Sequence, residues 1–391
     1  MGGFGAAFLI CILFKESLHI SHQCYPLACE KVNVTSGSFS PYQKQLLKHL
    51  PIKYMDQQEK LVPHLLPRKN YICHVKNLKY YLQKGLIVNK VHRILRFRQA
   101  AWLKSYVDFN SARRLNSLTE FERMFFKLCV NAVFGKGMES VRKRMNVKIV
   151  NNLKTAEKLI SKSQFLSHEI LGRKLVCFNM QKSVVTLDKA IYTGFSVLEL
   201  SKLHMAQFHY DYVKVKWGDN AKLLLTDTDS LAYLIKTADV YEDLKDDLSI
   251  FDTSNLDPAH SLYSTSNAGV VGKMKDEVKG QILLKFVGLG PKAYCFLGQK
   301  PSKLERKTFK KMAMKGISKD IQERSLSYEM VEAVLLHQNV LACSVNSIRS
   351  YKHKLYSIKS KKAALHAFDS KRYILEDGIS TLPYGHFMIR E

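Results

Sequence analysis

Residues 223 to 235 constrain the fold more than any other part of the sequence. Two apolar runs flank a polar tip of four residues, Asp227-Thr228-Asp229-Ser230. Leu, Tyr and Ile favour strands, whereas Asp and Ser favour turns, so the pattern predicts a β-hairpin with two carboxylates at its tip. Such carboxylates suit Mg²⁺, and two ions can clamp a phosphoryl group during transfer. The alternative is an acidic surface turn, which Asp favours through local hydrogen bonds.

The charge of the chain predicts a polyanionic partner. Of 391 residues, 46% are apolar, enough for a sizeable core and two or three domains. Lys and Arg total 61 against 34 acids, a formal charge of +27 that favours nucleic acid or an acidic membrane. Residues 90 to 148 carry fourteen basic and four acidic residues (+10), and residues 300 to 319 carry eight and one (+7). Residues 239 to 257, with seven acids and one Lys, cannot face the same ligand closely. A solvated basic face is the simpler reading of each run, but two separated runs favour a nucleic-acid footprint.

The cysteines and the amino-terminal segment exclude several kinds of site. Eight cysteines without a Cys-x-x-Cys pair predict reduced thiols of an intracellular protein. His19, His22, Cys24 and Cys29 have spacings that zinc could accept, but no matching second pair follows, so no zinc site is predicted. Residues 4 to 14 are apolar but too few to span a bilayer. They are either a buried strand or helix or a segment outside the folded domain, and no membrane partner is predicted.

The sequence predicts one long helix from Ser117 to the region of Gly135 and Gly137. The spacing from Ser117 to Glu120 is that of a capping box. One stripe of this helix combines two cations, an amide and an aromatic ring, at Arg123, Lys127, Asn131 and Phe134. Such a stripe can hold a phosphate chain and a sugar, and Gly135 lets a ligand approach closely. An amphipathic helix with a solvated basic face is the alternative.

Three other stretches have simpler patterns. Residues 36 to 68 are punctuated by Gly and Pro, which predicts irregular connections rather than a long helix. Residues 196 to 212 have the apolar spacing of a core helix. Residues 286 to 296 predict a strand or turn around Lys292 and Tyr294, which either meet a phosphodiester or form a solvated Lys beside a packed Tyr.

Three motifs occur in order at residues 127 to 135, 226 to 230 and 292 to 294. Together they resemble three motifs of family B DNA polymerases. The closer similarity is to the protein-primed branch found in Polinton or Maverick transposons and related viruses. It covers the chain from about Glu16 to the C-terminus and is carried by residues 188 to 237, 272 to 297 and 371 to 386. The resemblance implies an α+β fold with palm, fingers and thumb.

The resemblance implies a nucleotide site on the long helix. Lys127 matches the lysine that contacts the incoming triphosphate, Asn131 the neighbouring polar contact, and Phe134 the position near the nucleotide sugar. The helix stripe adds Arg123 and Gly135 to this site. Phe134 stands where the motif often has Tyr, and Ala132 stands where it commonly has Ser, but neither change removes a charge.

The resemblance also implies catalytic and primer-binding residues. Asp229 matches the palm carboxylate that binds the catalytic metals, with Asp227 as its less direct neighbour. Lys292 and Tyr294 match the pair that touches the primer strand, and Lys315 lies in the basic segment that leads into the thumb. The partners implied are a DNA primer-template, a dNTP, two Mg²⁺ ions and a terminal priming protein.

The resemblance assigns the parts of the chain as follows: 1–15 unassigned, 16–67 partial palm and connection, 68–145 fingers, 146–300 palm with the hairpin, and 301–391 thumb and C-terminal region. The family's first palm motif, an Asp followed shortly by Leu-Tyr, is expected upstream of His19, but no acid precedes Lys15. We therefore expect the carboxy-terminal part of a DNA-directed DNA polymerase, without its exonuclease domain and first palm motif, and we do not expect the chain alone to be fully active. The alternative is a non-catalytic nucleic-acid-binding remnant of a mobile element.

Overall fold

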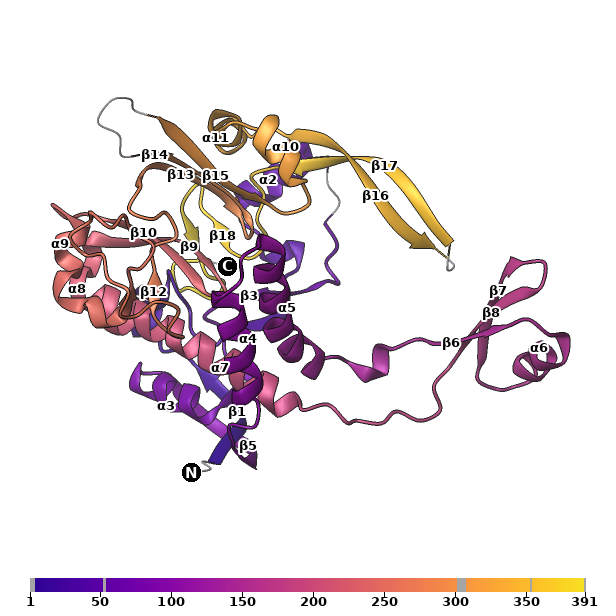
Figure 1. The fold of residues 1–391 in the computed structure, drawn as a ribbon. Coiled ribbons are helices and arrows are strands. Elements are labelled where there is room, and N and C mark those ends of the chain that lie inside the picture. The colour runs from indigo at the N-terminus through magenta and orange to yellow at the C-terminus, as the bar shows by residue number, and fades with distance from the viewer. Residues whose placement is uncertain (1–3, 52–53, 301–306, 352–353, 390–391) are drawn as a thin grey trace. The chain divides into compact units, whose positions relative to one another are not determined.

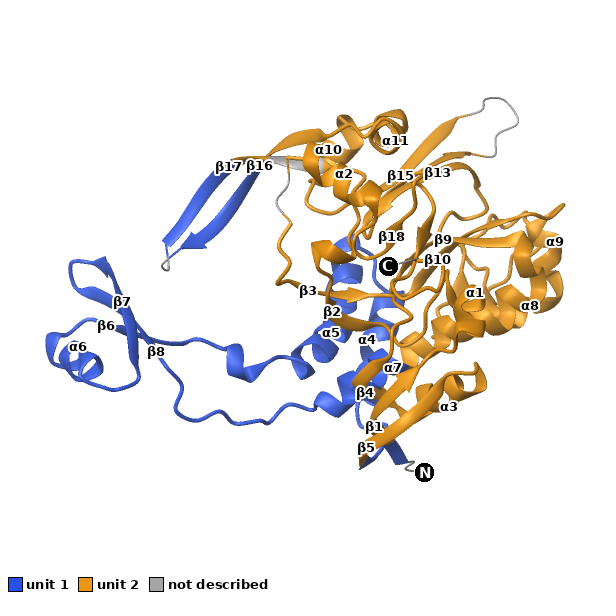
Figure 2. Cartoon of the chain, turned by 180° about the vertical axis from the view of Figure 1, so that it is seen from behind, with its two compact units in different colours: residues 1–5, 96–199, 346–359 blue, residues 6–95, 200–345, 360–391 orange. Residues whose placement is uncertain are grey.

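The computed structural model describes residues 4–51, 54–300, 307–351 and 354–389. The chain mixes helices and strands along its whole length, which confirms the predicted combination of α and β structure. It divides into two compact units (Figure 2). Unit 1 contains residues 1–5, 96–199 and 346–359, and unit 2 contains residues 6–95, 200–345 and 360–391. Each hydrophobic cluster of the described residues lies within one unit.

The apolar amino-terminal segment is an interior strand. Three strands form the first sheet, in the order β4 (Arg68–His74), β1 (Phe4–Leu13) and β5 (Ile87–Arg98). Figure 1 labels β1 and β5 near the amino terminus, and Figure 2 labels all three strands. Ile10 and Ile12 are fully buried, and they pack in one cluster with Tyr71 and Tyr80. Tyr80 belongs to α3 (Val75–Gln83), which follows β4 directly. Of the alternatives that the sequence left open for residues 4 to 14, the buried strand is confirmed.

A long helical segment closes this cluster in unit 2. It consists of α7 (Ile191–Gln207), a π-helical turn (Phe208–Val213), α8 (Lys214–Trp217) and a 3-10 turn (Gly218–Asn220). Ala206 and Tyr210 are buried in the cluster, and Leu203 packs against it. The predicted core helix is thus confirmed at its carboxy-terminal end, whereas Val197, nearer the start, is 52% exposed.

Two buried histidines join this helical segment to its neighbours. His22, in α1 (His19–His22), lies with its Nδ1 2.6 Å from the Tyr210 hydroxyl. Nδ1 of His209 lies 2.9 Å from the hydroxyl of Tyr233. Burial lowers the pKa of both histidines to about 4. Both therefore stay neutral in the folded chain at neutral pH.

Acid should destabilise unit 2 through these two histidines. In the unfolded chain a histidine has a pKa of about 6.5, so the unfolded state binds more protons once the pH falls below that value. Stability is full above pH 6.5 and is lost as the pH falls toward 4, by about 2 kcal/mol for each histidine at pH 5. Urea unfolding at pH 7.5 and pH 5 should show this loss, and His22→Asn should reduce it. The exposed-site control His49→Asn should lose as much stability between pH 7.5 and pH 5 as the unmodified chain. If His22→Asn loses just as much, the assignment is refuted.

The irregular connections expected for residues 36 to 68 are interrupted by a helix. α2 (Pro41–His49) begins with a capping box, in which the Ser40 hydroxyl accepts from the Gln43 amide and the Gln43 side chain accepts from the Ser40 amide. α2 has only nine residues, so the expectation that no long helix forms here is confirmed. Pro41 can begin it because a missing N–H costs nothing at the first helical position. Two short strands, β2 (Glu30–Asn33) and β3 (Glu59–Val62), pair with each other. In the sequence, β2 precedes α2 and β3 follows it.

The end of the chain packs on this amino-terminal part of unit 2. The short strands β18 (Tyr373–Ile374) and β19 (Thr381–Leu382) pair with each other. The Gln43 side chain, which is fully buried, donates to the carbonyls of Asp369 and Arg372 at 2.7 and 3.0 Å. Phe368 and Tyr384 share a buried cluster with Leu46. Residues from both ends of the chain therefore build one core.

A three-stranded sheet and two helices form the third cluster of unit 2. The strands are β13 (Ile282–Gly290), β14 (Ala293–Gln299) and β15 (Thr308–Met314), and the helices are α10 (Lys319–Arg324) and α11 (Tyr328–Leu336). Val287, Cys295 and Val331 are buried between the sheet and α11. The opposite face of the sheet carries Tyr294 and Phe296, whose rings meet edge to face.

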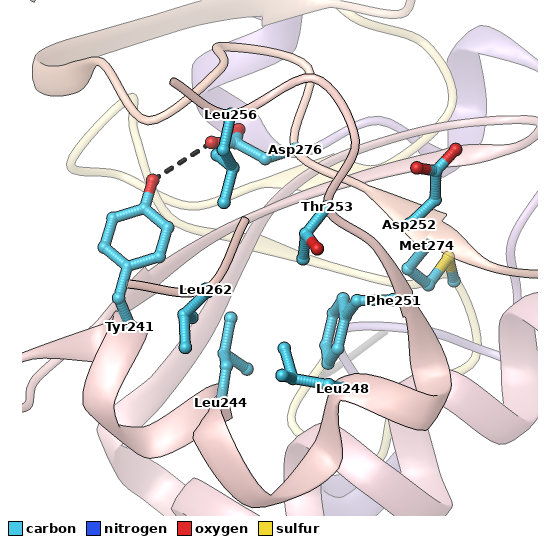
Figure 3. Close-up of a pocket in the computed structure, with 10 residues that line it drawn as sticks. All are labelled: Tyr241, Leu244, Leu248, Phe251, Asp252, Thr253, Leu256, Leu262, Met274 and Asp276. Carbon is cyan, nitrogen blue, oxygen red and sulfur yellow. Dashed lines mark hydrogen bonds between the residues drawn. The ribbon is translucent and has the colours of Figure 1, made fainter. Parts of the chain in front are cut away.

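Carboxylates of the acidic segment, residues 239 to 257, accept hydrogen bonds within a small loop-rich region. This region contains α9 (Val240–Leu244), a 3-10 helix (Lys245–Ile250), β11 (Phe251–Asp252) and β12 (Met274–Lys275). Asp243 accepts hydrogen bonds from the Trp217 indole and the Thr237 hydroxyl. Figure 3 shows the apolar hollow of this region and the bond from Tyr241 to Asp276, 3.0 Å long. The hollow measures about 30 Å³, which is room for a single water.

Unit 1 contains a helix pair and a small sheet with its own core. The helix pair is α4 (Lys104–Leu115) and α5 (Glu120–Gly137), and the sheet consists of β6 (Asn146–Val150), β8 (Leu175–Met180) and β7 (Phe165–Gly172), covered by α6 (Leu153–Ile160). Phe178 is buried between α6 and the sheet. The long strands β16 (Leu341–Tyr351) and β17 (Lys354–Leu365) form a hairpin, and Lys354 at its tip pairs with Glu169 of β7 at 3.5 Å.

The two units divide the chain differently from the assigned parts. Residues 68 to 95, assigned to the fingers, contribute β4, α3 and most of β5 to unit 2. Residues 360 to 391, assigned with the thumb, also belong to unit 2. Within the described residues, no helix is both long enough and apolar enough to cross a membrane.

Candidate functional site

The acidic tip is a hairpin turn, as the sequence predicts. β9 (Ala221–Asp227) and β10 (Ser230–Ile235) pair antiparallel, with Asp227 opposite Ser230. The carbonyl of Asp227 accepts from the Asp229 amide at 2.7 Å and from the Ser230 hydroxyl at 3.2 Å. Thr228, between the two carboxylates, has a φ of +61°, which is unusual for a β-branched residue. The hydrogen bond from the Asp229 amide to the carbonyl of Asp227, two residues back, closes a three-residue γ-turn around Thr228. With a positive φ at its central residue, this type of γ-turn is rare and strained.

A second turn brings Lys292 to this tip. Pro291 and Lys292 connect β13 to β14, and Lys292 also has a positive φ of +58°. The Lys292 carbonyl accepts from the Lys315 amide at 2.8 Å, which ties the turn to the end of β15. The Lys292 ammonium then lies 3.3 Å from the Asp227 carboxylate. Asp227, Lys292 and Lys315 are three predicted site residues from distant parts of the sequence, and they are therefore neighbours in unit 2.

These residues line an open groove of about 590 Å³. Its lining combines one carboxylate from the hairpin with a strongly basic wall from the turn, β15 and α10: Asp227, Lys292, Lys310, Lys311, Met312, Ala313, Met314, Lys315, Lys319, Gln322 and Glu323. A groove with five lysines in its lining has the charge needed to hold a phosphodiester backbone.

The five lysines of the groove are not equivalent. The Lys310 ammonium donates to the carbonyls of Gln322, Glu323 and Leu326, and thus satisfies the end of α10. Lys311 lies 3.6 Å from the Glu277 carboxylate. Lys292, Lys315 and Lys319 are exposed to solvent. Because Lys292 is paired with Asp227, Lys315 and Lys319 are the two that are directly available to an incoming anion.

Tyr294 has a protonated hydroxyl near this groove. It lies on β14, opposite Gly288 and Ala313 of the neighbouring strands, and is half-buried. Burial, and after it the charge of Asp227, raises the pKa of the Tyr294 phenol. The hydroxyl therefore remains a hydrogen-bond donor at neutral pH.

Asp229 differs from its expected orientation. The resemblance gives Asp229 the direct metal-binding role and Asp227 the less direct one, which implies that the Asp229 carboxylate points into the site. In the structure Asp229 is exposed at the turn, and Asp227 is the carboxylate that lines the groove. The donor set of the tip, two carboxylates, is of the kind that Mg²⁺ takes, since this ion usually binds one or two carboxylates together with substrate phosphates. Within the described ranges, no group of three or more His, Cys, Asp or Glu side chains is placed to hold a metal.

The predicted long helix is α5, and its stripe is exposed. The helix begins with a capping box between Thr119 and Glu122, two residues later than the one predicted from Ser117. The reason is that the Ser117 hydroxyl donates to the carbonyl of Arg113 at the end of α4. The predicted end of the helix near Gly137 is confirmed.

The side chains of the stripe have few partners within unit 1. Lys127 and Asn131 are exposed, and Arg123 pairs with Glu120 at 3.1 Å. A side chain at Gly135 would meet nothing within 4 Å, so packing in the chain does not require this glycine. The stripe belongs to unit 1 and the acidic tip to unit 2, so the shared nucleotide and metal site that the resemblance implies for Lys127 and Asp229 stays a prediction.

Sequence reasoning missed several residues around the groove. Lys319 lies in the basic run that was noticed, but nothing in the sequence placed it beside Lys292. No signal pointed to Glu277, which pairs with Lys311. Residues 301 to 306 of the same basic run lie outside the described residues.

Comparisons with known proteins give one structural neighbour to report. No family model matches the chain, and no curated protein matches it. The chain is similar to the solved structure of Phi29 DNA polymerase complexed with primer-template DNA and incoming nucleotide substrates, with 12% sequence identity and a TM-score of 0.45. The match covers 93% of this chain and 59% of that chain, so this chain spans about three fifths of the length of the protein it matches.

Proposed function

We propose that this chain is the palm, fingers and thumb portion of a family B DNA polymerase of the protein-primed branch. The observation that carries the proposal is the ion pair between Asp227 and Lys292 on the wall of a basic groove. The two residues come from two separate motifs of the family, and the motif order in the sequence agrees with it. The reaction proposed is attack of a primer 3′ hydroxyl on the α-phosphate of a dNTP, with release of pyrophosphate.

The groove residues would hold the primer strand. Lys292, Lys315 and Lys319 offer exposed ammonium groups to successive phosphates, and Tyr294 offers a neutral hydroxyl donor beside them. Asp227 and Asp229 would hold Mg²⁺, which supplies charge neutralisation for the phosphoryl transfer when it is bound.

The exposed stripe of α5 would hold the incoming nucleotide. Lys127 and Arg123 bring positive charge for the triphosphate, Asn131 brings an amide, and Phe134 brings a ring for the sugar. The open space at Gly135 leaves room for a ligand to approach the helix backbone. The hairpin of β16 and β17 is the proposed thumb.

The second candidate function is binding of nucleic acid without turnover, as in a remnant of a mobile element. It is favoured by one observation, which is that the described residues add no third metal-binding side chain to Asp227 and Asp229. The same groove would then bind DNA, but no nucleotide would be added.

Lysine acylation with and without primed duplex DNA tests the binding site. Lys292, Lys315 and Lys319 should be protected several-fold by the DNA, because their ammonium groups would contact phosphates. Lys44 and Lys69, exposed in unit 2 outside the groove, are the matched controls and should react equally in both samples. Lys310 should react slowly throughout because three carbonyls hold its ammonium. Mass spectrometry measures each site, and equal reaction of the three groove lysines with and without bound DNA would overturn the proposal.

A further inference from the structure

We propose, on the basis of the proposed function, that Lys292 is an internal counter-ion that couples cation binding at the acidic tip to phosphate binding in the groove. Its ammonium lies 3.3 Å from Oδ1 of Asp227. The Thr228 hydroxyl donates to the same oxygen at 3.3 Å. The carboxylate that lines the groove is therefore already engaged by a positive charge of the chain itself.

The backbone fixes where this pair forms. Lys292 sits in the tight turn between β13 and β14, and its carbonyl is held by the Lys315 amide. Asp227 ends β9, and its carbonyl is held by the Asp229 amide and the Ser230 hydroxyl. Two anchored turns thus present opposite charges to each other. The pair is a property of how the two hairpins pack in unit 2.

The side chain of Lys292 can nevertheless leave Asp227. It remains 58% exposed, whereas the Asp227 side chain is 28% exposed. An ammonium on a flexible four-carbon stem can turn toward another anion at little cost, unlike the planar fork of an Arg. The wall of the groove places Lys315 and Lys319 nearby, so a phosphate bound there would also attract Lys292.

Reciprocal coupling follows from this competition. A divalent cation at Asp227 is repelled by the ammonium that already occupies the carboxylate. A DNA phosphate in the groove draws that ammonium away and leaves the carboxylate open to the cation. By linkage, each ligand then raises the affinity for the other by the same factor, typically about 5- to 150-fold for coupled sites.

Mn²⁺ binding tests the coupling without any need for catalysis. Mn²⁺ favours the same oxygen ligands as Mg²⁺, and electron paramagnetic resonance counts the free ion. The 391-residue chain is titrated with Mn²⁺ alone and with a saturating short primer-template. The same titrations of the Asp227→Asn/Asp229→Asn double variant measure the Mn²⁺ that binds to the DNA itself and to other surfaces of the chain. This background is subtracted from the Mn²⁺ binding of the unmodified chain. DNA should raise the Mn²⁺ affinity of the unmodified chain about 5- to 150-fold.

Substitution of Lys292 separates the coupling from simple DNA binding. Lys292→Met should bind Mn²⁺ more tightly than the unmodified chain without DNA, and saturating DNA should then add little. Lys69→Met, an exposed lysine of unit 2 outside the groove, should keep the full effect of DNA, and Lys292→Arg should keep most of it. Circular dichroism of each variant verifies folding. If Lys292→Met misfolds, Lys292→Gln takes its place.

Two results would overturn the coupling while leaving the proposed function in place. One is DNA that binds the groove but leaves the Mn²⁺ affinity of the unmodified chain unchanged. The other is a Lys292→Met variant in which the effect of DNA equals that in the unmodified chain. Failure of DNA to protect the groove lysines from acylation would instead remove the proposed function, and the coupling with it.

Discussion

On the proposed function, the purified 391-residue chain should extend a primer at least about a thousandfold more slowly than the same chain joined to a segment that carries the first palm motif, a magnitude of about 4 kcal/mol in the barrier. The described residues gather no third metal ligand around Asp227 and Asp229. Loss of one carboxylate from a two-metal site removes several kcal/mol of charge stabilisation, and about 1.4 kcal/mol corresponds to a tenfold change in rate. Single-nucleotide extension of a labelled primer with Mg²⁺ measures the two rates.

A matched pair of aspartate variants controls this experiment. Asp229→Ala should abolish extension by the joined chain, because in the proposed function this carboxylate holds Mg²⁺ together with Asp227. Asp219→Ala, a fully exposed aspartate just before β9, removes the same charge at a distance from the tip and should leave the rate unchanged. Robust Mg²⁺-dependent extension by the 391-residue chain alone, lost in Asp229→Ala, would show that another carboxylate completes the site.

Replacing three groove lysines should change the salt dependence of DNA binding. Each phosphate neutralised contributes about −0.9 to the slope of log affinity against log salt. With Lys292, Lys315 and Lys319 changed to Gln, the slope should therefore become shallower by about 2.7. At 50 mM salt, the loss in affinity should be on the order of a thousandfold on the same counterion-release argument. Fluorescence anisotropy of a labelled primer-template over a range of salt measures both quantities.

The control variant for this prediction has the same net charge as the groove variant. Lys44, Lys48 and Lys69 are exposed lysines of unit 2 outside the groove, and their triple change to Gln removes the same three charges. If the groove governs DNA binding, this control variant should keep nearly the full slope of log affinity against log salt. If both triple variants lose the same slope, the overall field of the +27 chain, and not the groove, governs binding.

The local parts of the candidate site could be predicted from sequence because they depend on neighbouring residues. Apolar strand formers next to Asp and Ser were sufficient for the hairpin at Asp227. The start of α5 was harder, because Ser117 and Thr119 each stand three residues before a Glu. Which of them caps the helix depends on α4, whose end takes the Ser117 hydroxyl.

The groove could not be predicted because it depends on contacts between distant segments. Nothing near Lys310 in the sequence indicates that its ammonium is held by carbonyls at the end of α10, whereas that of Lys292 pairs with Asp227. Residues 4 to 14 were ambiguous for a related reason. A strand that is covered on both faces, as β1 is apart from the exposed Phe4, is apolar on both faces and lacks the alternation that distinguishes a strand from a helix.

The bonds from Gln43 to Asp369 and Arg372 determine when unit 2 can finish folding. The first of these bonds joins residues 326 positions apart. At about 5 to 20 residues per second, a ribosome needs on the order of tens of seconds to make the intervening chain. Until then Leu46 lacks Phe368 and Tyr384, its cluster partners from the end of the chain, so the nascent protein carries an uncovered apolar surface. We therefore expect a version truncated before Phe368 to leave this apolar surface uncovered.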